Sequence, residues 1–145
     1  MRLHLTRRTQ IASQLLGLAL GLCGSGARAD VVAVVSSKSA ITTLSANQVA
    51  DIFLGRMSRF PNGALAVPID LNDGSVERDR FYAKIAGKSP AQIKSYWSKI
   101  IFTGRGQPPK TVHDDFDMKK YIAANVGTIG YIEESMVDAS VRVLN

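Results

Sequence analysis

The sequence has little of the residue types that most often carry catalysis or bind metals. It contains one cysteine and two histidines among 145 residues, and beyond residue 29 only His113 remains. Without paired cysteines there is no disulfide framework, and a lone histidine without cysteine partners does not make a zinc site. His113 stands next to Asp114 and Asp115, where we expect a solvated loop residue rather than a catalytic base. We therefore predict no enzyme activity, no cofactor and no metal site.

Long hydrophobic runs and early acidic residues are also missing. No apolar stretch reaches the roughly 18 to 20 residues that a membrane-spanning helix needs, and no acidic residue precedes Asp30. Residues 1–29 instead combine a basic start, a short apolar segment at 11–23 and an A-x-A end at 27–29. This order is typical of a secretory signal peptide. We predict cleavage after Ala29, a periplasmic location, and no membrane insertion of the remaining chain.

The formal net charge of +6 belongs mostly to the predicted signal peptide. Residues 1–29 carry four arginines and no acid, whereas residues 30–145 carry 14 basic and 12 acidic residues, a net charge of +2. Such a domain lacks the excess of Lys and Arg that nucleic-acid binding needs, so we exclude nucleic acid as a partner. The segment from 30 to 145 is long enough for one domain with its own core.

Strands and helices alternate along residues 30–145. A continuous β-branched run at 31–35 predicts a strand buried on both faces. Shorter apolar runs predict three further strands, at 65–70, 128–132 and 141–144. Capping residues and apolar spacing predict four helices, which begin after Ser45, after Ser75, at Ser89 and at Asp114. The third helix is expected to turn Tyr96 and Trp97 into the core. Together these elements predict an α/β fold with a mostly parallel sheet flanked by helices.

The turn between the second predicted strand and the following helix is the best candidate for a binding site. A helix start after a strand offers unpaired backbone N–H groups and the positive end of the helix dipole, which attract anions. Ligands of open α/β sheets also bind at the carboxyl ends of strands. The candidate contacts for a small oxyanion are Asp73, Gly74, Ser75 and Arg78, together with Ser36 and Ser37 after the first strand. The same pattern also fits an ordinary capped helix start.

Several strings of the sequence occur in a familiar order. They are LSANQVADIFLGR at 44–56, the Asp73-Gly74-Ser75 turn, FTGRG at 102–106 and GTIGYI at 127–132. In this order they resemble the periplasmic phosphate-binding proteins of ABC transporters. The resemblance implies a type 2 periplasmic-binding fold, in which two α/β lobes hold phosphate between helix N-termini. The segment after the predicted signal peptide has the length of a single lobe.

The resemblance weakens at the phosphate-binding turn. The family usually has Arg-x-Asp-Gly-Ser-Gly-Thr there, whereas this chain has Leu71, Val76 and Glu77 at the arginine, second glycine and threonine positions. A carboxylate at position 77 repels an anion unless it turns away. A single lobe also lacks the second wall that excludes water and strengthens hydrogen bonds. We expect weak binding of phosphate or a similar oxyanion, a membrane transporter or sensor as partner, and a homodimer or another protein if affinity is to be high. The alternative is an envelope interaction module of the same fold that has lost ligand binding.

Overall fold

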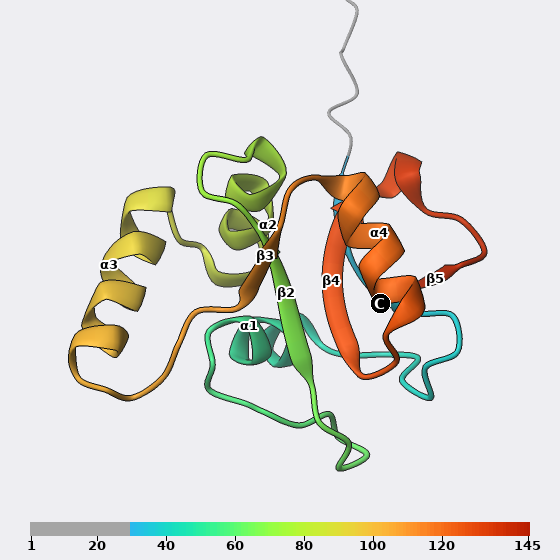
Figure 1. The fold of residues 1–145 in the computed structure, drawn as a ribbon, viewed down its shortest axis with the longest axis horizontal. Coiled ribbons are helices and arrows are strands. Elements are labelled where there is room, and N and C mark those ends of the chain that lie inside the picture. The colour runs from blue at the N-terminus through green and yellow to red at the C-terminus, as the bar shows by residue number, and fades with distance from the viewer. Residues whose placement is uncertain (1–29) are drawn as a thin grey trace, which may run out of the picture.

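Five strands and four α-helices make up the part of the chain that the structure describes (Figure 1). The structure is a computed structural model that describes residues 30–145, and the predicted signal peptide lies outside the described residues. The strands are β1 (Val31–Ser36), β2 (Val67–Leu71), β3 (Lys110–Val112), β4 (Thr128–Glu133) and β5 (Val141–Val143). The helices are α1 (Ala46–Phe53), α2 (Val76–Ala86), α3 (Pro90–Phe102) and α4 (Asp115–Ala124), with a 3-10 turn η1 (Glu134–Met136). Within residues 30–145, no helix is long and apolar enough to cross a membrane.

The four helices begin at the polar residues that the sequence indicated. Ser45 and Ser89 each accept a hydrogen bond from the backbone N–H three residues on, and the side-chain oxygen of the glutamine at that position accepts one from the N–H of the cap residue. These capping boxes satisfy N–H groups that a helix start leaves without partners. Ser75 and Asp114 cap α2 and α4 through their side chains. The predicted helix starts are therefore confirmed.

The sheet is mixed, with the strand order β3-β2-β4-β1-β5. β2 runs parallel to β3 and β4, whereas β1 runs antiparallel to β4 and β5. The predicted α/β class is confirmed, but a parallel arrangement holds only in the half of the sheet that is built around β2. The physical reason is that a β-branched run such as 31–35 indicates burial and not direction. The direction of β1 depends on β4, a partner that comes far later in the chain.

The sequence pattern did not indicate β3. Its three residues lie at one edge of the sheet, where Lys110 and Thr111 are exposed and Val112 is half-buried. Three residues are too few to show the alternation by which a half-buried strand is recognised. Pairing with residues 69–71 of β2 makes this segment a strand, and it brings the carboxyl ends of β2 and β3 side by side.

The helices cover both faces of the sheet, as Figure 1 shows. α4 packs on one face, mainly against β4, whereas α1 and α2 pack on the other. Because side chains alternate along a strand, Gly130 of β4 lies under α4 and Tyr131 faces α1 and α2. The ring of Tyr131 stacks on Phe81 with centroids 3.9 Å apart, and Phe53 meets Phe81 edge-on at 4.7 Å. This aromatic cluster forms the centre of the core on that face.

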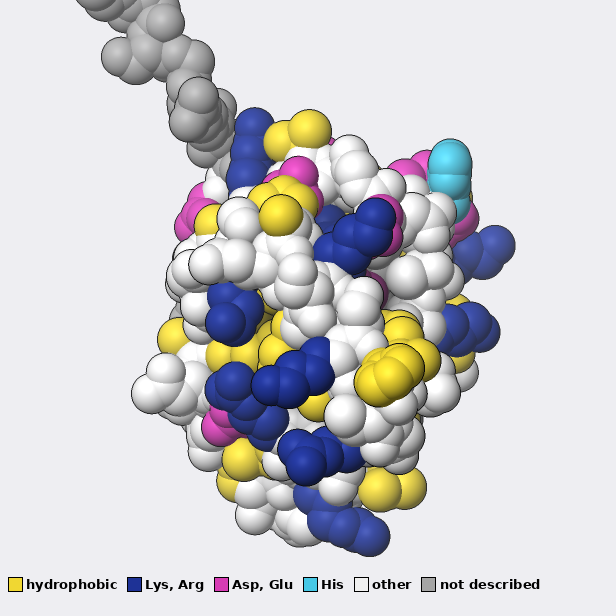
Figure 2. Space-filling model, turned by 90° about the vertical axis from the view of Figure 1, so that its left-hand side faces the viewer, with side chains coloured by type: hydrophobic (Ala, Val, Ile, Leu, Met, Phe, Trp, Pro, Cys, Tyr) yellow, Lys and Arg dark blue, Asp and Glu magenta, His cyan; other side chains and the backbone are white. Residues whose placement is uncertain are grey.

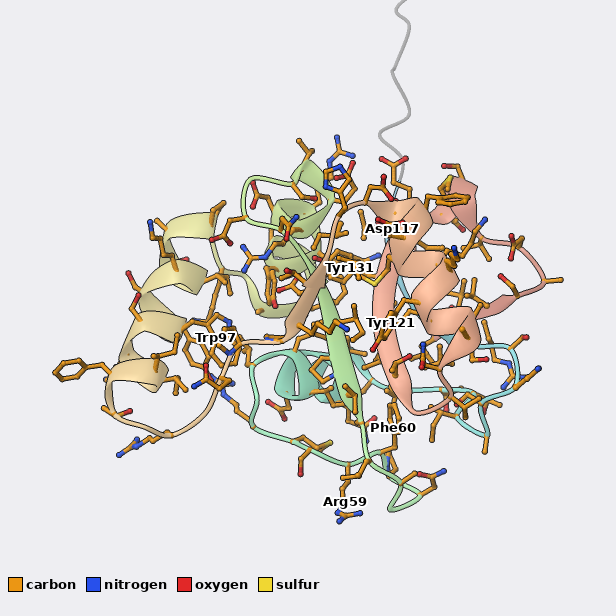
Figure 3. All side chains as sticks on the ribbon, viewed as in Figure 1. Arg59, Phe60, Trp97, Asp117, Tyr121 and Tyr131 are labelled. Atoms are coloured by element: carbon orange, nitrogen blue, oxygen red, sulfur yellow. The ribbon has the colours of Figure 1, made fainter. Side chains whose placement is uncertain are left out.

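A narrow apolar stripe attaches α3 to the rest of the molecule. Of its thirteen residues only Ile93 and Trp97 are buried, and Trp97 lies between α3 and the remainder of the fold (Figure 3). Tyr96 is half-buried and donates its hydroxyl to the carbonyl oxygen of Leu54 at 2.6 Å. The prediction that Trp97 belongs to the core is confirmed, whereas Tyr96 lies at the core's margin. The outer side of α3 is left to solvent.

Replacing Gly130 with alanine is expected to lower the free energy of unfolding by about 1 to 3 kcal/mol, the usual cost of overpacking a core. A Cβ at this position would lie 2.5 Å from Sδ of Met118 and 2.9 Å from Cδ1 of Ile122, so α4 would have to move away from β4. Urea unfolding of the two proteins measures the difference. Gly106→Ala is the control, because a Cβ there meets only Ile100 at 3.5 Å. Equal losses of stability in the two variants would show that the packing of α4 on β4 does not require a glycine at position 130.

Candidate functional site

The turn at the carboxyl end of β2 leads directly into α2. Gly74 has a φ of 87°, in the left-handed region that favours glycine. Ser75 then caps the helix by accepting a hydrogen bond from the N–H of Arg78 at 3.2 Å, and its own N–H donates to the carbonyl oxygen of Asn72. The structure thus brings four of the predicted candidates, Asp73, Gly74, Ser75 and Arg78, into one turn of chain.

Asp70 is the centre of a buried polar network beneath this turn. The residue is 1% exposed, and its carboxylate lies 3.2 Å from Nε of Arg78. The hydroxyls of Tyr82 and Tyr131 both donate to this carboxylate, that of Tyr82 at 2.8 Å. The backbone N–H of Leu71 adds a further hydrogen bond at 2.8 Å. These donors replace the hydrogen bonds to water that the carboxylate loses on burial. Without them, the free-energy cost of burying the charge would be high.

The protonation states of this network are set by burial and by Asp70. Burial raises the pKa of Tyr82 and of Tyr131 above the ordinary tyrosine value, and the negative charge of Asp70 raises both further. The two hydroxyls therefore stay protonated and donate. Burial alone lowers the pKa of Arg78, but neighbouring charges, Asp70 foremost, raise it above its ordinary value. The network is an ion pair between Asp70 and Arg78 with two tyrosine hydroxyls as further donors to the carboxylate.

Arg78 is engaged on a second side as well. Its Nη1 lies 2.7 Å from a carboxylate oxygen of Asp73, whose side chain is exposed. The single positive charge of Arg78 is thus shared between Asp70, which is buried, and Asp73, which is not. An anion that contacts this guanidinium has to share it with two carboxylates already in place.

Glu77 turns toward the candidate turn and not away from it. The hydroxyl of Ser75 donates to Oε2 of Glu77 at 2.8 Å. A carboxylate within the first turn of a helix is stabilised by the helix dipole, so Glu77 takes up part of the attraction that the start of α2 offers to an anion. The departure from the family pattern at position 77 therefore has a direct structural consequence.

A second carboxyl group adds negative charge near the start of α2. Oδ2 of Asp115, at the first position of α4, accepts a hydrogen bond from the N–H of Glu133 at 2.8 Å, while its Oδ1 is buried without a partner among residues 30–145. Burial raises the pKa of Asp115 above its ordinary value, and the charges of Glu77, Glu133 and Asp114 raise it further, against the hydrogen bond from Glu133. Carboxyl groups from two helix starts thus act on one another here.

A cavity of about 380 Å³ lies between the turn, α3 and β3. Its polar lining includes Asp70, Asp73 and Arg78 from the β2–α2 segment, Lys94 and Ser98 from α3, and Thr111 from β3. Lys94 makes no ion pair within residues 30–145. Sequence analysis missed the residues of α3 and β3, because no local motif marks them. They reach the cavity only through the packing of α3 and the pairing of β3 with β2.

Ser36 and Ser37 do not join this site. β1 is antiparallel to β4, which is parallel to β2. The carboxyl end of β1 therefore lies at the end of the sheet opposite to the carboxyl end of β2. Ser36 is 1% exposed and donates its hydroxyl to the carbonyl oxygen of Ala123 at 3.2 Å, while the N–H of Ser37 donates to Ser140. The direction of β1 thus separates Ser36 and Ser37 from the turn at Ser75, and a role for them in ligand binding stays a prediction.

Comparison with known proteins gives matches to structures only, since no family model and no curated protein sequence matches the chain. A protein described as a phosphate ABC transporter substrate-binding protein from Clostridium perfringens, solved with bound phosphate, is 22% identical with a TM-score of 0.63, covering 80% of this chain and 44% of that one. An ABC-type phosphate transport receptor from Vibrio cholerae is 18% identical with a TM-score of 0.63, covering 80% and 45%. PstS from Borrelia burgdorferi is 16% identical with a TM-score of 0.55, covering 80% and 46%.

These likenesses establish the fold. The chain spans less than half the length of the proteins that it matches, and it has the architecture of a single lobe of a periplasmic-binding protein. The single-lobe α/β fold that the sequence motifs predicted is therefore confirmed. The similar proteins are described as transport binding proteins and not as enzymes.

Asp70→Asn is expected to destabilise the protein by about 3 to 5 kcal/mol, because it leaves the guanidinium of Arg78 largely buried without its main partner. Urea unfolding at neutral pH measures the loss. Asp73→Asn removes the other carboxylate of Arg78, but its side chain is 79% exposed, so a change below about 1 kcal/mol is expected. If the two variants lose the same stability, the buried pair is not the dominant contact of Arg78.

Proposed function

We propose that this protein binds phosphate, or a closely similar oxyanion, without covalent chemistry and acts as a substrate-binding-like domain. The observation that carries the proposal is the cavity at the carboxyl ends of β2 and β3, which Lys94 enters without a carboxylate partner among the described residues. Arg78, in the first turn of α2, lines the same cavity, where the positive end of the helix dipole favours an anion. The fold supports the same reading, because a similar protein was solved with bound phosphate.

The lining of the cavity favours an oxyanion that carries a proton. The ammonium of Lys94 and the hydroxyls of Ser98 and Thr111 can donate hydrogen bonds, whereas the exposed carboxylate of Asp73 only accepts them. Phosphate near neutral pH keeps at least one P–OH group, which a carboxylate can accept from, and sulfate has none. We infer that phosphate binds better than sulfate at this cavity.

The affinity should be low for this chain alone. Arg78 already neutralises carboxylates, Glu77 takes up the hydroxyl of Ser75, and no second lobe covers the cavity within residues 30–145. A homodimer or another protein would supply the second wall and exclude water. In this proposal the domain hands phosphate to a membrane transporter or reports it to a sensor. Its proposed role is to bind and release the ligand without making or breaking a covalent bond, so we assign it no enzyme activity.

Calorimetric titration of the purified protein with phosphate and with sulfate tests the binding site. We expect phosphate to bind in the millimolar range, which corresponds to about −4 kcal/mol, and sulfate to bind more weakly. Lys94→Gln should weaken phosphate binding about tenfold, the effect of losing a charged hydrogen-bond partner. Glu77→Gln should strengthen it, because it removes a competing charge and keeps a side chain that can accept from Ser75.

Lys38→Gln is the matched control for Lys94→Gln. Lys38 is exposed and follows β1 at the opposite edge of the sheet, so its loss changes the net charge equally without touching the cavity. Phosphate binding that is absent at millimolar concentrations, or that falls equally in both lysine variants, would contradict the proposal. Ser75→Ala is less decisive, because the serine also caps α2.

The proposal places the working protein in the periplasm, after removal of residues 1–29. Mass spectrometry of the protein recovered from a periplasmic fraction is expected to show Asp30 as the first residue, because the A-x-A end of a signal peptide precedes it. Ala29→Arg should block cleavage and leave the longer precursor. Recovery of the unprocessed chain as a soluble cytoplasmic protein would contradict export.

A further inference from the structure

α3 and its flanking segments carry a strongly asymmetric share of the charge. Residues 81–113 contain six Lys or Arg residues and no acidic residue. The rest of residues 30–145 contains eight basic and all twelve acidic residues. A domain with a net charge of only +2 is therefore polarised, with a cationic region around α3 and an anionic remainder. Figure 2 looks at the side that carries α3, and dark-blue Lys and Arg side chains gather over its middle and lower part.

Four of these six cations are not engaged within the described chain. Lys84 pairs with Asp30 at 2.9 Å, and the ammonium of Lys110 lies over the ring of Tyr121 at 4.8 Å. The other four make no ion pair within residues 30–145. We call these four cations together with residues 101–102 the α3 face: Lys88, Lys94, Lys99, Ile101, Phe102 and Arg105.

Phe102 is the most exposed large apolar side chain of the described residues, at 93%. α3 is held by Ile93 and Trp97, and at about 100° per residue Phe102 falls on the side of the helix opposite Ile93. Its neighbour Ile101 is 47% exposed, and every residue from 101 to 108 is exposed. The apolar tip of the α3 face therefore projects away from the body of the protein.

We propose that the α3 face docks on an anionic phospholipid surface. Lys and Arg side chains near such a surface are attracted to its negative headgroups, and an apolar side chain beside them enters the boundary between headgroups and acyl chains. Lys99 and Arg105 flank Phe102 along the chain, so both interactions are available at one place. The protein lies on the bilayer in this arrangement and does not span it.

A lipid surface fits this face better than an acidic protein does. Phe102 projects singly, so a protein partner would need a pocket matched to it, whereas a bilayer accepts an apolar tip at any point. The charge of the face also extends from Lys88 to Arg105 along the whole of α3, and a uniformly anionic surface complements it without a matched set of carboxylates. Lys94 and Ile101 of this face also line the cavity, whereas Lys99, Phe102 and Arg105 do not, so the test rests on these three residues and is made without phosphate.

Co-sedimentation with lipid vesicles tests the proposal. The full chain is mixed, without phosphate, with vesicles of phosphatidylcholine alone or of phosphatidylcholine and phosphatidylglycerol in equal parts. We expect stronger binding to the anionic vesicles and loss of that preference at high salt. Lys99→Glu with Arg105→Glu should weaken binding at least about 25-fold, about fivefold for each cation lost. Phe102→Ser should weaken it about tenfold, from the apolar area no longer buried.

Matched control variants show whether vesicle binding comes from the α3 face or from another part of the chain. Residues 1–29 are the same in all of these variants, so they cannot cause a difference between them. Lys38→Glu with Lys120→Glu reverses two exposed lysines away from α3, and Phe116→Ser removes an aromatic side chain that is 62% exposed on α4. Neither should change vesicle binding as the α3 variants do. In the same way, Phe102→Trp should give a blue shift of added tryptophan fluorescence on anionic vesicles, and Phe116→Trp should not.

Three results would overturn the proposal. The first is equal binding to neutral and anionic vesicles, and the second is equal loss in the α3 variants and their controls. The third is binding of an acidic polypeptide such as polyglutamate that needs Lys99 and Arg105 but not Phe102, together with no such dependence on vesicles. That third outcome would assign the face to an acidic protein.

Discussion

The buried ion pair between Asp70 and Arg78 fixes the place where β2 ends and α2 begins, beside the candidate binding site. It joins the end of β2 to the first turn of α2, and the hydroxyls of Tyr82 and Tyr131 link the same carboxylate to the middle of α2 and to β4. A charge this deeply buried is tolerated only with a full set of partners. The partners come from three elements, so the pair sets the position of α2 on the sheet as well as its own charge balance.

The same pair limits what the candidate site can do. It fixes the start of α2 at the carboxyl end of β2, which is where an anion would bind, yet it uses the charge of Arg78 that an anion would need. Glu77 and Asp73 add negative charge at the same place. The attraction for an oxyanion therefore rests on Lys94 and on the hydroxyl donors of the cavity wall, Ser98 and Thr111. A site of this composition favours a weakly held, exchangeable ligand.

Charge is separated at the level of the whole domain as well. The carboxylates collect around the starts of α2 and α4, where helix dipoles stabilise them. The cations collect along α3, which touches the core through only a narrow stripe and so exposes most of its surface. The ligand cavity and the proposed membrane contact thus lie next to each other on α3, and they share Lys94 and Ile101.

Local chemistry decided a large part of this protein. Serine and aspartate caps, a helix-starting proline and short apolar runs predicted all four α-helices and four of the five strands, and the motifs at 44–56 and 127–132 predicted the single-lobe fold. These signals act over a few neighbouring residues, which is why a sequence displays them. Only the tertiary structure decided the direction of β1, the existence of β3 and the burial of Asp70 with two distant tyrosines. It also brought Lys94 and Thr111 to the cavity that Asp73 and Arg78 line. Each joins residues far apart in the chain, and no local pattern specifies which remote partner a strand, a carboxylate or a cavity wall will receive.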